Sequence, residues 1–297
     1  MSWFEAMLAA FLATLGRPRW WLLALAAFLV RGGVLLLALP ILTIPSPADV
    51  GRFLGPDLVG IGPGALGPAF VPVVSGVALA LFAWLLVSGW LGAWLDSELI
   101  EAAAAEEDLD GIRAVGRVPV GRAFAVRVIA HLPTLAVLVV GLFVLLQVTY
   151  AELTNPSSGD LPLLLRVVIR APGASIAVLM AWLVGETWGG IAERRLALGE
   201  RLLAALGSAL NDTFRPSAIA TIAATVAVPA LVLLVAWPAA RNGFDRLWPL
   251  VVDGADPAAT QVALVLFVAV WLAGAGLLAV ALAWRSAAWT AESLRRG

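Results

Sequence analysis

One charged residue stands out because it lies inside an apolar run. Arg31 is the single charge between residues 20 and 44. A lone arginine near the centre of a membrane-spanning helix is unfavourable by about 2.5–3.5 kcal/mol, even on the insertion scales that penalise it least. We therefore expect Arg31 to have a partner inside the protein. The pair would either hold helices together or form part of a substrate or proton site.

Glu186 is the partner that the sequence favours for Arg31. If the first span begins near Pro18, Arg31 lies roughly 20 Å along it at 1.5 Å per residue. Helical side chains lean toward their own N-terminus, so residues on helices of opposite direction lean toward each other. Glu186, near the inner end of the fourth span, is then expected to converge on Arg31. The pair is either a packing contact or part of a substrate or proton site.

Other polar and small residues are secondary candidates. Gly185 and Gly189 flank Glu186 at a spacing that allows close helix packing. His131 is the only histidine, and it is either an interfacial polar residue or a proton shuttle or metal ligand. Gln147 is a polar residue in the third span. The acidic run from Asp96 to Asp110 is expected to be a solvated helix end and loop.

Composition excludes several kinds of chemistry. The chain has no cysteine and no lysine, which excludes thiol catalysis, cysteine-bound metals and a Schiff-base lysine. A single histidine does not allow a convincing nucleophile–histidine–acid set, and no phosphate-binding loop is present. The net charge of −1 argues against a nucleic-acid partner. We therefore expect no metal, no cofactor and no enzyme activity; an enzyme that acts on lipid substrates with carboxylates alone is the remaining alternative.

The elements that must position these residues are membrane-spanning helices. Of the 297 residues, 62% are hydrophobic and 13% charged, and the apolar runs are continuous, which favours an all-α polytopic membrane protein. Runs of about 20 apolar residues predict six spans, at residues 20–44, 69–94, 132–150, 171–191, 218–237 and 259–284.

Arginine placement orients these spans. With a cytoplasmic N-terminus, thirteen arginines fall on inner segments and five in outer loops. The positive-inside rule then places both termini in the cytoplasm. The abundance of alanine, glycine, leucine and arginine suggests a bacterial gene, and hence a multi-pass protein of the bacterial inner membrane. The outer loops are expected at 45–68, 152–170 and 239–257, with a short amphipathic segment at 161–170.

The chain reads as a single membrane domain, 1–297, with one unit used three times, at approximately 1–112, 113–198 and 199–297. Each unit is expected to form a hairpin of two spans preceded by an amphipathic helix on the cytoplasmic interface, at about 4–15, 122–129 and 200–210. Pro18, Pro133 and Pro216 would mark the turn into the membrane. The return spans end in similar tails at 92–99, 189–196 and 287–294.

Two functions follow from this pattern. The first is a non-enzymatic accessory or scaffold subunit that packs against lipids, another membrane protein or further copies of itself. The second is a transporter or permease for a small or lipid-like solute, with Arg31 and Glu186 at its site. A water-accessible cavity touching Arg31 would favour transport, and a dry bundle with an apolar flank would favour the accessory role.

Overall fold

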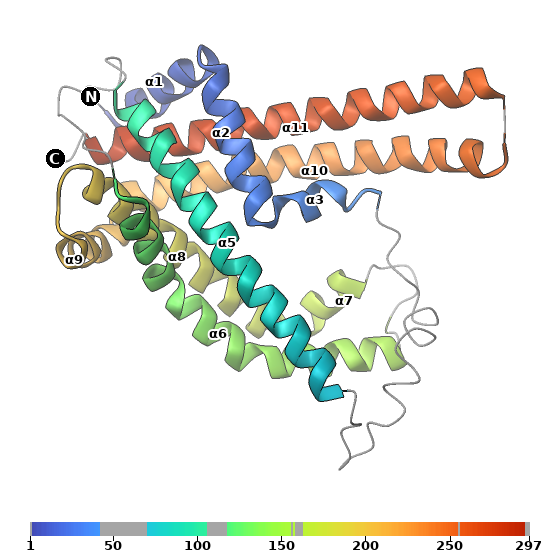
Figure 1. Cartoon of the computed structure of the whole chain (residues 1–297), viewed down its shortest axis with the longest axis horizontal. Coiled ribbons are helices and arrows are strands. Elements are labelled where there is room, and N and C mark those ends of the chain that lie inside the picture. Colours follow the sequence, from blue (N-terminus) through green and yellow to red (C-terminus); the bar gives the residue numbers. More distant parts are fainter. Residues whose placement is uncertain are drawn as a thin grey trace. The chain divides into compact units, whose positions relative to one another are not determined.

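The computed structural model describes residues 2–41, 70–105, 118–155, 157, 163–254 and 256–294. Over these residues the chain is almost entirely helical and contains no strand (Figure 1). The predicted all-α class is therefore confirmed for this part of the chain. The expected loop at 45–68 and most of the acidic run at 106–110 lie outside the described residues.

By length and composition, five stretches of helix are long and apolar enough to cross a membrane. They are Pro18–Ala38, Val120–Gly141, Pro172–Ala197, Pro216–Val252 and Pro257–Leu294. These five overlap five of the six predicted spans. The remaining span, 69–94, falls on α5 (Phe70–Ala104) from Phe70 onward and stays a prediction.

The described chain divides into two compact units. Unit 1 comprises Met1–Ile41, Gly89–Leu135 and Met180–Gly297. Unit 2 comprises Leu42–Ser88 and Ala136–Leu179. The three helices α5, α6 (Val120–Thr154) and α8 (Pro172–Ala197) each contribute residues to both units.

Small side chains form much of one of the two core clusters of unit 1. Helix α1 (Trp3–Leu15) packs against α2 (Pro18–Phe28) and α11 (Pro257–Leu294) through buried alanines. Fully or almost fully buried members of this contact are Ala6, Ala10, Ala24, Ala283, Ala287 and Ala288. Alanine lets helix backbones approach closely, which is how helices associate where lipid supplies no hydrophobic drive.

Tryptophan indoles tie the helices of unit 1 to one another. Five of them donate their N–H to an oxygen elsewhere in the unit, so they act as donors between segments and not only as interface residues. The bonds are Trp3 to Thr221 Oγ1 (2.9 Å), Trp21 to Thr14 O (2.7 Å), Trp188 to Leu206 O (2.8 Å), Trp271 to Leu37 O (2.9 Å) and Trp284 to Met7 O (3.1 Å).

Two of the three expected interfacial helices are separate helices. They are α1 and α9 (Leu202–Thr213), and Pro18 and Pro216 begin the helices that follow, as expected. The third prediction is wrong, because residues 122–129 belong to α6, which continues through Pro133. Membrane helices tolerate an internal proline because neighbouring groups can satisfy the backbone that it leaves unpaired.

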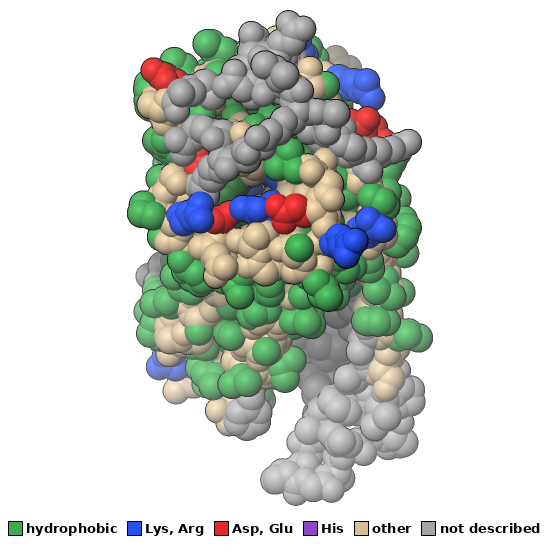
Figure 2. All heavy atoms as spheres, turned by 90° about the vertical axis from the view of Figure 1, so that its left-hand side faces the viewer, with side chains coloured by type: hydrophobic (Ala, Val, Ile, Leu, Met, Phe, Trp, Pro, Cys, Tyr) green, Lys and Arg blue, Asp and Glu red, His purple; other side chains and the backbone are tan. Residues whose placement is uncertain are grey.

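Ion pairs fasten α9 to the end of α8. Arg195 pairs with Asp212 and, at 2.7 Å, with Glu200, and Asp212 also pairs with Arg215 at 2.9 Å. Figure 2 shows the face on the side of α9 in Figure 1, with arginine and acidic side chains next to one another among hydrophobic ones.

The last two helices form one long hairpin. Helix α10 (Pro216–Val252) and α11 lie side by side, joined by a short turn that includes Gly254 at φ 62° (Figure 1). The expected loop at 239–257 is therefore wrong: α10 passes through Pro238 and Pro249 and ends at Val252. Helices of 37 and 38 residues are about 55 Å long at 1.5 Å per residue.

Unit 2 contains a buried acid with two arginine partners. Glu152 of α6 is fully buried and contacts Arg166 (3.2 Å) and Arg170 (3.0 Å) of α7 (Leu163–Arg170). The Ser157 N–H also donates to its carboxylate at 3.1 Å. The short amphipathic segment expected at 161–170 is thus a helix, and one carboxylate holds it against α6.

This attachment predicts a pH effect. Burial alone would raise the pKa of Glu152, but the Ser157 N–H and the guanidinium groups of Arg170 and Arg166 outweigh it and lower the pKa. A lowered pKa means that the attachment is present above the ordinary carboxyl pKa of about 4.3 and is lost as the pH falls through the lowered value. Val168 is exposed, and the chain has no cysteine, so Val168→Cys allows a single spin label on α7. This label should be immobile at pH 7 and mobile only in strong acid.

Replacing Glu152 with Gln should mobilise the same label at pH 7, because it removes the charge that both arginines contact. Continuous-wave EPR in detergent measures the mobility. The matched control is Glu101→Gln, at an exposed position on α5. A label that stays immobile in Glu152→Gln would show that this carboxylate does not hold α7.

Candidate functional site

A network of charged side chains lies inside unit 1. It joins one residue of the first span to residues of α5, α6, α8 and α11, helices that are far apart in the sequence. Its members are Arg31, Asp96, Arg127, His131, Glu186, Glu193 and Arg285.

Arg31 lies where the first span changes its helical form. Helix α2 ends at Phe28, a five-residue kinked segment η1 (Leu29–Gly33) follows, and α3 (Val34–Ala38) continues the chain. Gly32 has φ 101°, which glycine adopts at little energetic penalty and which breaks the regular helix. The first span is therefore kinked at Gly32, directly beside Arg31.

The Arg31 side chain reaches Asp96 on α5. Its Nη2 lies 2.5 Å from Asp96 Oδ2. The guanidinium passes across Gly92, where an added Cβ would lie 2.4 Å from Arg31 Nε. Any larger residue at position 92 would displace the Arg31 guanidinium from this position. Asp96 is not the solvated acid that the sequence suggested, since its side chain is only 15% exposed.

Arg127 is the hub of the network. Its Nε donates to Glu193 Oε1 at 2.6 Å and its Nη2 to Asp96 Oδ2 at 3.2 Å. Its Nη1 contacts Glu186 Oε2 at 3.4 Å. One guanidinium thus binds carboxylates from α5 and from two turns of α8, using three of its nitrogens.

Glu186 belongs to the same network, but Arg31 is not its direct partner among the described residues. Its Oε2 accepts from Arg285 Nη2 at 2.6 Å, and Oε1 lies 3.2 Å from His131 Nε2. The direct Arg31–Glu186 pair expected from the sequence is replaced by a chain of contacts through Asp96 and Arg127. Glu186 is paired with Arg127 of α6 and Arg285 of α11.

His131 contacts two acceptors. Its Nδ1 lies 2.9 Å from the carbonyl oxygen of Arg127, and its Nε2 faces Glu186. Both are acceptors when Glu186 is ionised, so the imidazole can bond to both only when both ring nitrogens carry a proton. Gln147, the other secondary candidate, lies on the part of α6 that belongs to unit 2, outside this network.

Gly185 and Gly189 bring α8 against α6. An added Cβ at Gly185 would lie 2.9 Å from the carbonyl oxygen of Ala130, and one at Gly189 would lie 3.3 Å from Ala130 Cβ. The two glycines allow the close approach that puts Glu186 within reach of Arg127 and His131.

Arg194 is a buried arginine with neutral partners. It is 6% exposed and donates to the Gly190 carbonyl (2.8 Å), the Thr290 hydroxyl (3.2 Å) and the Ser286 carbonyl (2.9 Å). No carboxylate is among its hydrogen-bond partners within the described residues. Its positive charge is therefore not neutralised by direct pairing.

A cavity of about 490 Å³ lies beside the network and within unit 1. Its polar wall contains Arg31, Asp96, Arg127, Glu186, Glu193, Arg194, Arg285 and Ser286. The remaining wall is mostly apolar and includes Phe28, Leu36, Trp182, Leu233, Leu278 and Leu282. Ligand sites commonly have this size and this combination of an apolar lining with a few polar groups.

Sequence reasoning missed Asp96, Arg127, Glu193 and Arg285 as site residues, because the two arginines were counted with the inner face and Asp96 with the solvated acidic run. One signal was present. In the similar tails at 92–99 and 189–196, Asp96 and Glu193 both occupy the fifth position. The arginine partners had no comparable signal, since nothing in the sequence shows which helices are adjacent.

The hub role of Arg127 gives a stability prediction. Arg127→Gln should destabilise the protein strongly, by about 3–5 kcal/mol, because it leaves buried carboxylates without their shared cation. Glu193 has Arg127 as its only ion-pair partner within the described residues, and its Oε2 has no hydrogen-bond partner there. Adding Glu193→Gln should therefore restore part of the lost stability.

Thermal unfolding in detergent measures both changes. Arg122→Gln, at an exposed position on the same helix, is the matched control and should have little effect. The hub assignment is contradicted if Arg127→Gln is as mild as Arg122→Gln, or if the two substitutions in the double variant destabilise additively.

Within the described residues no group of three or more histidine, cysteine or acidic side chains could hold a metal ion. No protein family, no curated protein and no solved structure matches the chain. The described part of the chain is all-helical, and several of its helices are long and apolar enough to span a membrane. Its larger unit contains a cavity lined in part by charged side chains.

Proposed function

We propose that this protein is a transporter or permease that binds a small or lipid-like solute in the cavity of unit 1. The observation that carries the proposal is the cavity of about 490 Å³ with Arg31 and Glu186 in its wall. Charged residues inside membrane segments favour a solute or ion pathway over simple packing, because their burial is otherwise unfavourable.

The interrupted first span supports the same function. Transporters often build their sites at discontinuous helices, where backbone outside regular helix faces a cavity. Here the change from α2 through η1 to α3 occurs at Arg31, and Phe28, Gly32, Gly33 and Leu36 all line the cavity.

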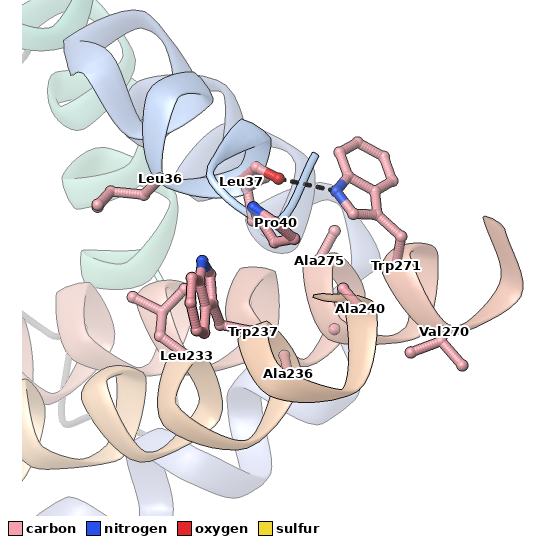
Figure 3. A pocket seen from close by; sticks show the side chains of 11 residues that line it. Leu36, Leu37, Pro40, Leu233, Ala236, Trp237, Ala240, Val270, Trp271 and Ala275 are labelled. Carbon is pink, nitrogen blue, oxygen red and sulfur yellow. Dashed lines mark hydrogen bonds between the residues drawn. The ribbon is translucent and has the colours of Figure 1, made fainter. Parts of the chain in front are cut away.

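The far end of the interrupted span is anchored, which supports a fixed site wall. Trp271 donates to the Leu37 carbonyl at 2.9 Å, as Figure 3 shows, and Arg241 donates to the Pro40 carbonyl at 3.2 Å. These donors satisfy carbonyls that a helix end would otherwise leave unpaired in an apolar environment.

An accessory subunit is the second candidate function, and the α10–α11 hairpin favours it. Its length of about 55 Å exceeds the hydrocarbon thickness of about 30 Å and the full bilayer of about 40–45 Å. Near its turn the hairpin exposes Trp248 (53%), Val251 (54%) and Val252 (60%). Apolar side chains beyond the hydrocarbon core favour contact with another membrane protein or a second copy of the chain.

Several further features belong to the proposal. We place the chain in a bacterial cytoplasmic membrane with both termini inside, on the strength of the arginine distribution. We retain the sixth span on α5 because of its apolar run, and the threefold repeat of hairpins because the return spans end in similar tails. The proposed role is non-enzymatic in both candidates.

Cysteine accessibility tests the transport proposal, and the natural chain already provides a cysteine-free background. Ser286→Cys places a thiol on the cavity wall. In sealed vesicles it should react with a membrane-impermeant methanethiosulfonate applied to either face, because a transporter opens its site to both sides in turn.

The matched control is Ala279→Cys, which lies on the same helix, is 4% exposed and is not part of the cavity wall. It should stay unreactive. Failure of Ser286→Cys to react from both faces would contradict a solute cavity and favour the accessory role. Reaction from one face only would contradict transport and leave a binding function.

A further inference from the structure

We propose that the ligand of this cavity is a single-chain amphiphile with an acidic headgroup, a phosphate or a carboxylate. The inference rests on the proposed solute-binding function and names the chemical class of the solute. The headgroup would contact the arginines of the polar wall, and the hydrocarbon chain would lie along the apolar wall.

The charges of the cavity favour an anion. Among the described residues its wall has four arginines and three carboxylates, which leaves one positive charge in excess. The carboxylates Asp96, Glu186 and Glu193 each have at least one arginine partner. Arg194, in contrast, has only neutral acceptors as hydrogen-bond partners there. A ligand with one acidic group would balance the wall.

Arg31 and Arg285 are the arginines best placed to meet the headgroup. Their side chains are 34% and 22% exposed, against 17% for Arg127, and each forms its ion pair through one nitrogen, Nη2. A guanidinium has donors on three nitrogens, so both residues retain N–H groups for an oxyanion. The planar donor set of arginine suits phosphate and carboxylate.

The apolar wall fits a hydrocarbon chain. Phe28 lies on one side of Arg31 in the sequence and Leu36 on the other, and Leu233, Leu278 and Leu282 complete the wall from α10 and α11. Apolar residues on both sides of Arg31 in the sequence therefore line the cavity together with it. An inorganic anion would leave the apolar wall unused, and a neutral lipid would leave the excess charge unbalanced.

A second pocket extends the apolar wall. It shares Leu36 and Leu233 with the cavity and lies where α3 meets the α10–α11 hairpin (Figure 3). Its other lining side chains are apolar or aromatic, among them Pro40, Trp237 and Val270. Figure 3 shows Leu36 beside this pocket, on the opposite side from Trp271. The pocket has a volume of only about 20 Å³, so it adds apolar surface beside the cavity and has room for no more than about one methyl group.

Binding of dodecyl phosphate to the full chain in phosphatidylcholine nanodiscs tests the proposal. Inorganic phosphate and dodecanol serve as the two half-ligands. Dodecyl phosphate should bind saturably, with one molecule per chain, and should protect Ser286→Cys from the thiol reagent. Neither half-ligand alone should do so.

Two variants separate the headgroup from the chain. Arg31→Gln should weaken dodecyl phosphate binding about tenfold or more, because it removes a charged donor to the headgroup. Leu36→Trp should do the same by filling the apolar wall without changing any charge. The matched controls are Arg246→Gln, at an exposed arginine of α10, and Leu35→Trp, at the neighbouring exposed position outside both pockets.

The outcomes separate this inference from the proposed function. Equal binding of dodecanol would overturn the acidic headgroup, and equal binding of inorganic phosphate would overturn the hydrocarbon chain. Absence of dodecyl phosphate binding, or binding insensitive to both variants, would overturn the ligand class. In each of these cases a reactive Ser286→Cys leaves solute transport standing, whereas an unreactive one removes the proposed function itself.

Discussion

Arg127 is the contact on which the polar interior of unit 1 depends. It binds Asp96 on one helix and Glu186 and Glu193 on another, so it holds α5, α6 and α8 around a single guanidinium. Charges in a poorly solvated interior are tolerated only when they are paired and hydrogen-bonded. Without Arg127 these carboxylates would repel one another, and no cation would hold α5, α6 and α8 together at this point.

The remaining features of the site follow from this constraint. Glycines at 92, 185 and 189 let the helix backbones approach closely enough for these side chains to meet. The change of helical form at Gly32 lets Arg31 join the network without continuing a regular helix through it. Arg31 and Arg285 belong to the network and also line the cavity.

Sequence and structure agree best on which segments form helices. Continuous apolar runs predicted helices that could span a membrane, and prolines at 18 and 216 predicted where two of them begin. The predictions that failed concern proline and loops. Pro133, Pro238 and Pro249 lie inside helices, because packed membrane helices accept a proline that a soluble helix would not.

The sequence by itself determined that Arg31 needs a partner and that this partner must come from within the protein, because the penalty for an isolated charge depends only on its apolar surroundings. It also indicated Glu186 and its flanking glycines as members of the same region. Only the tertiary structure decided that Asp96 takes the role expected of Glu186 and that Arg127 connects the two. Ion-pair partners are set by which helices are neighbours and by the direction of each side chain, and neither is written in the order of residues along one helix.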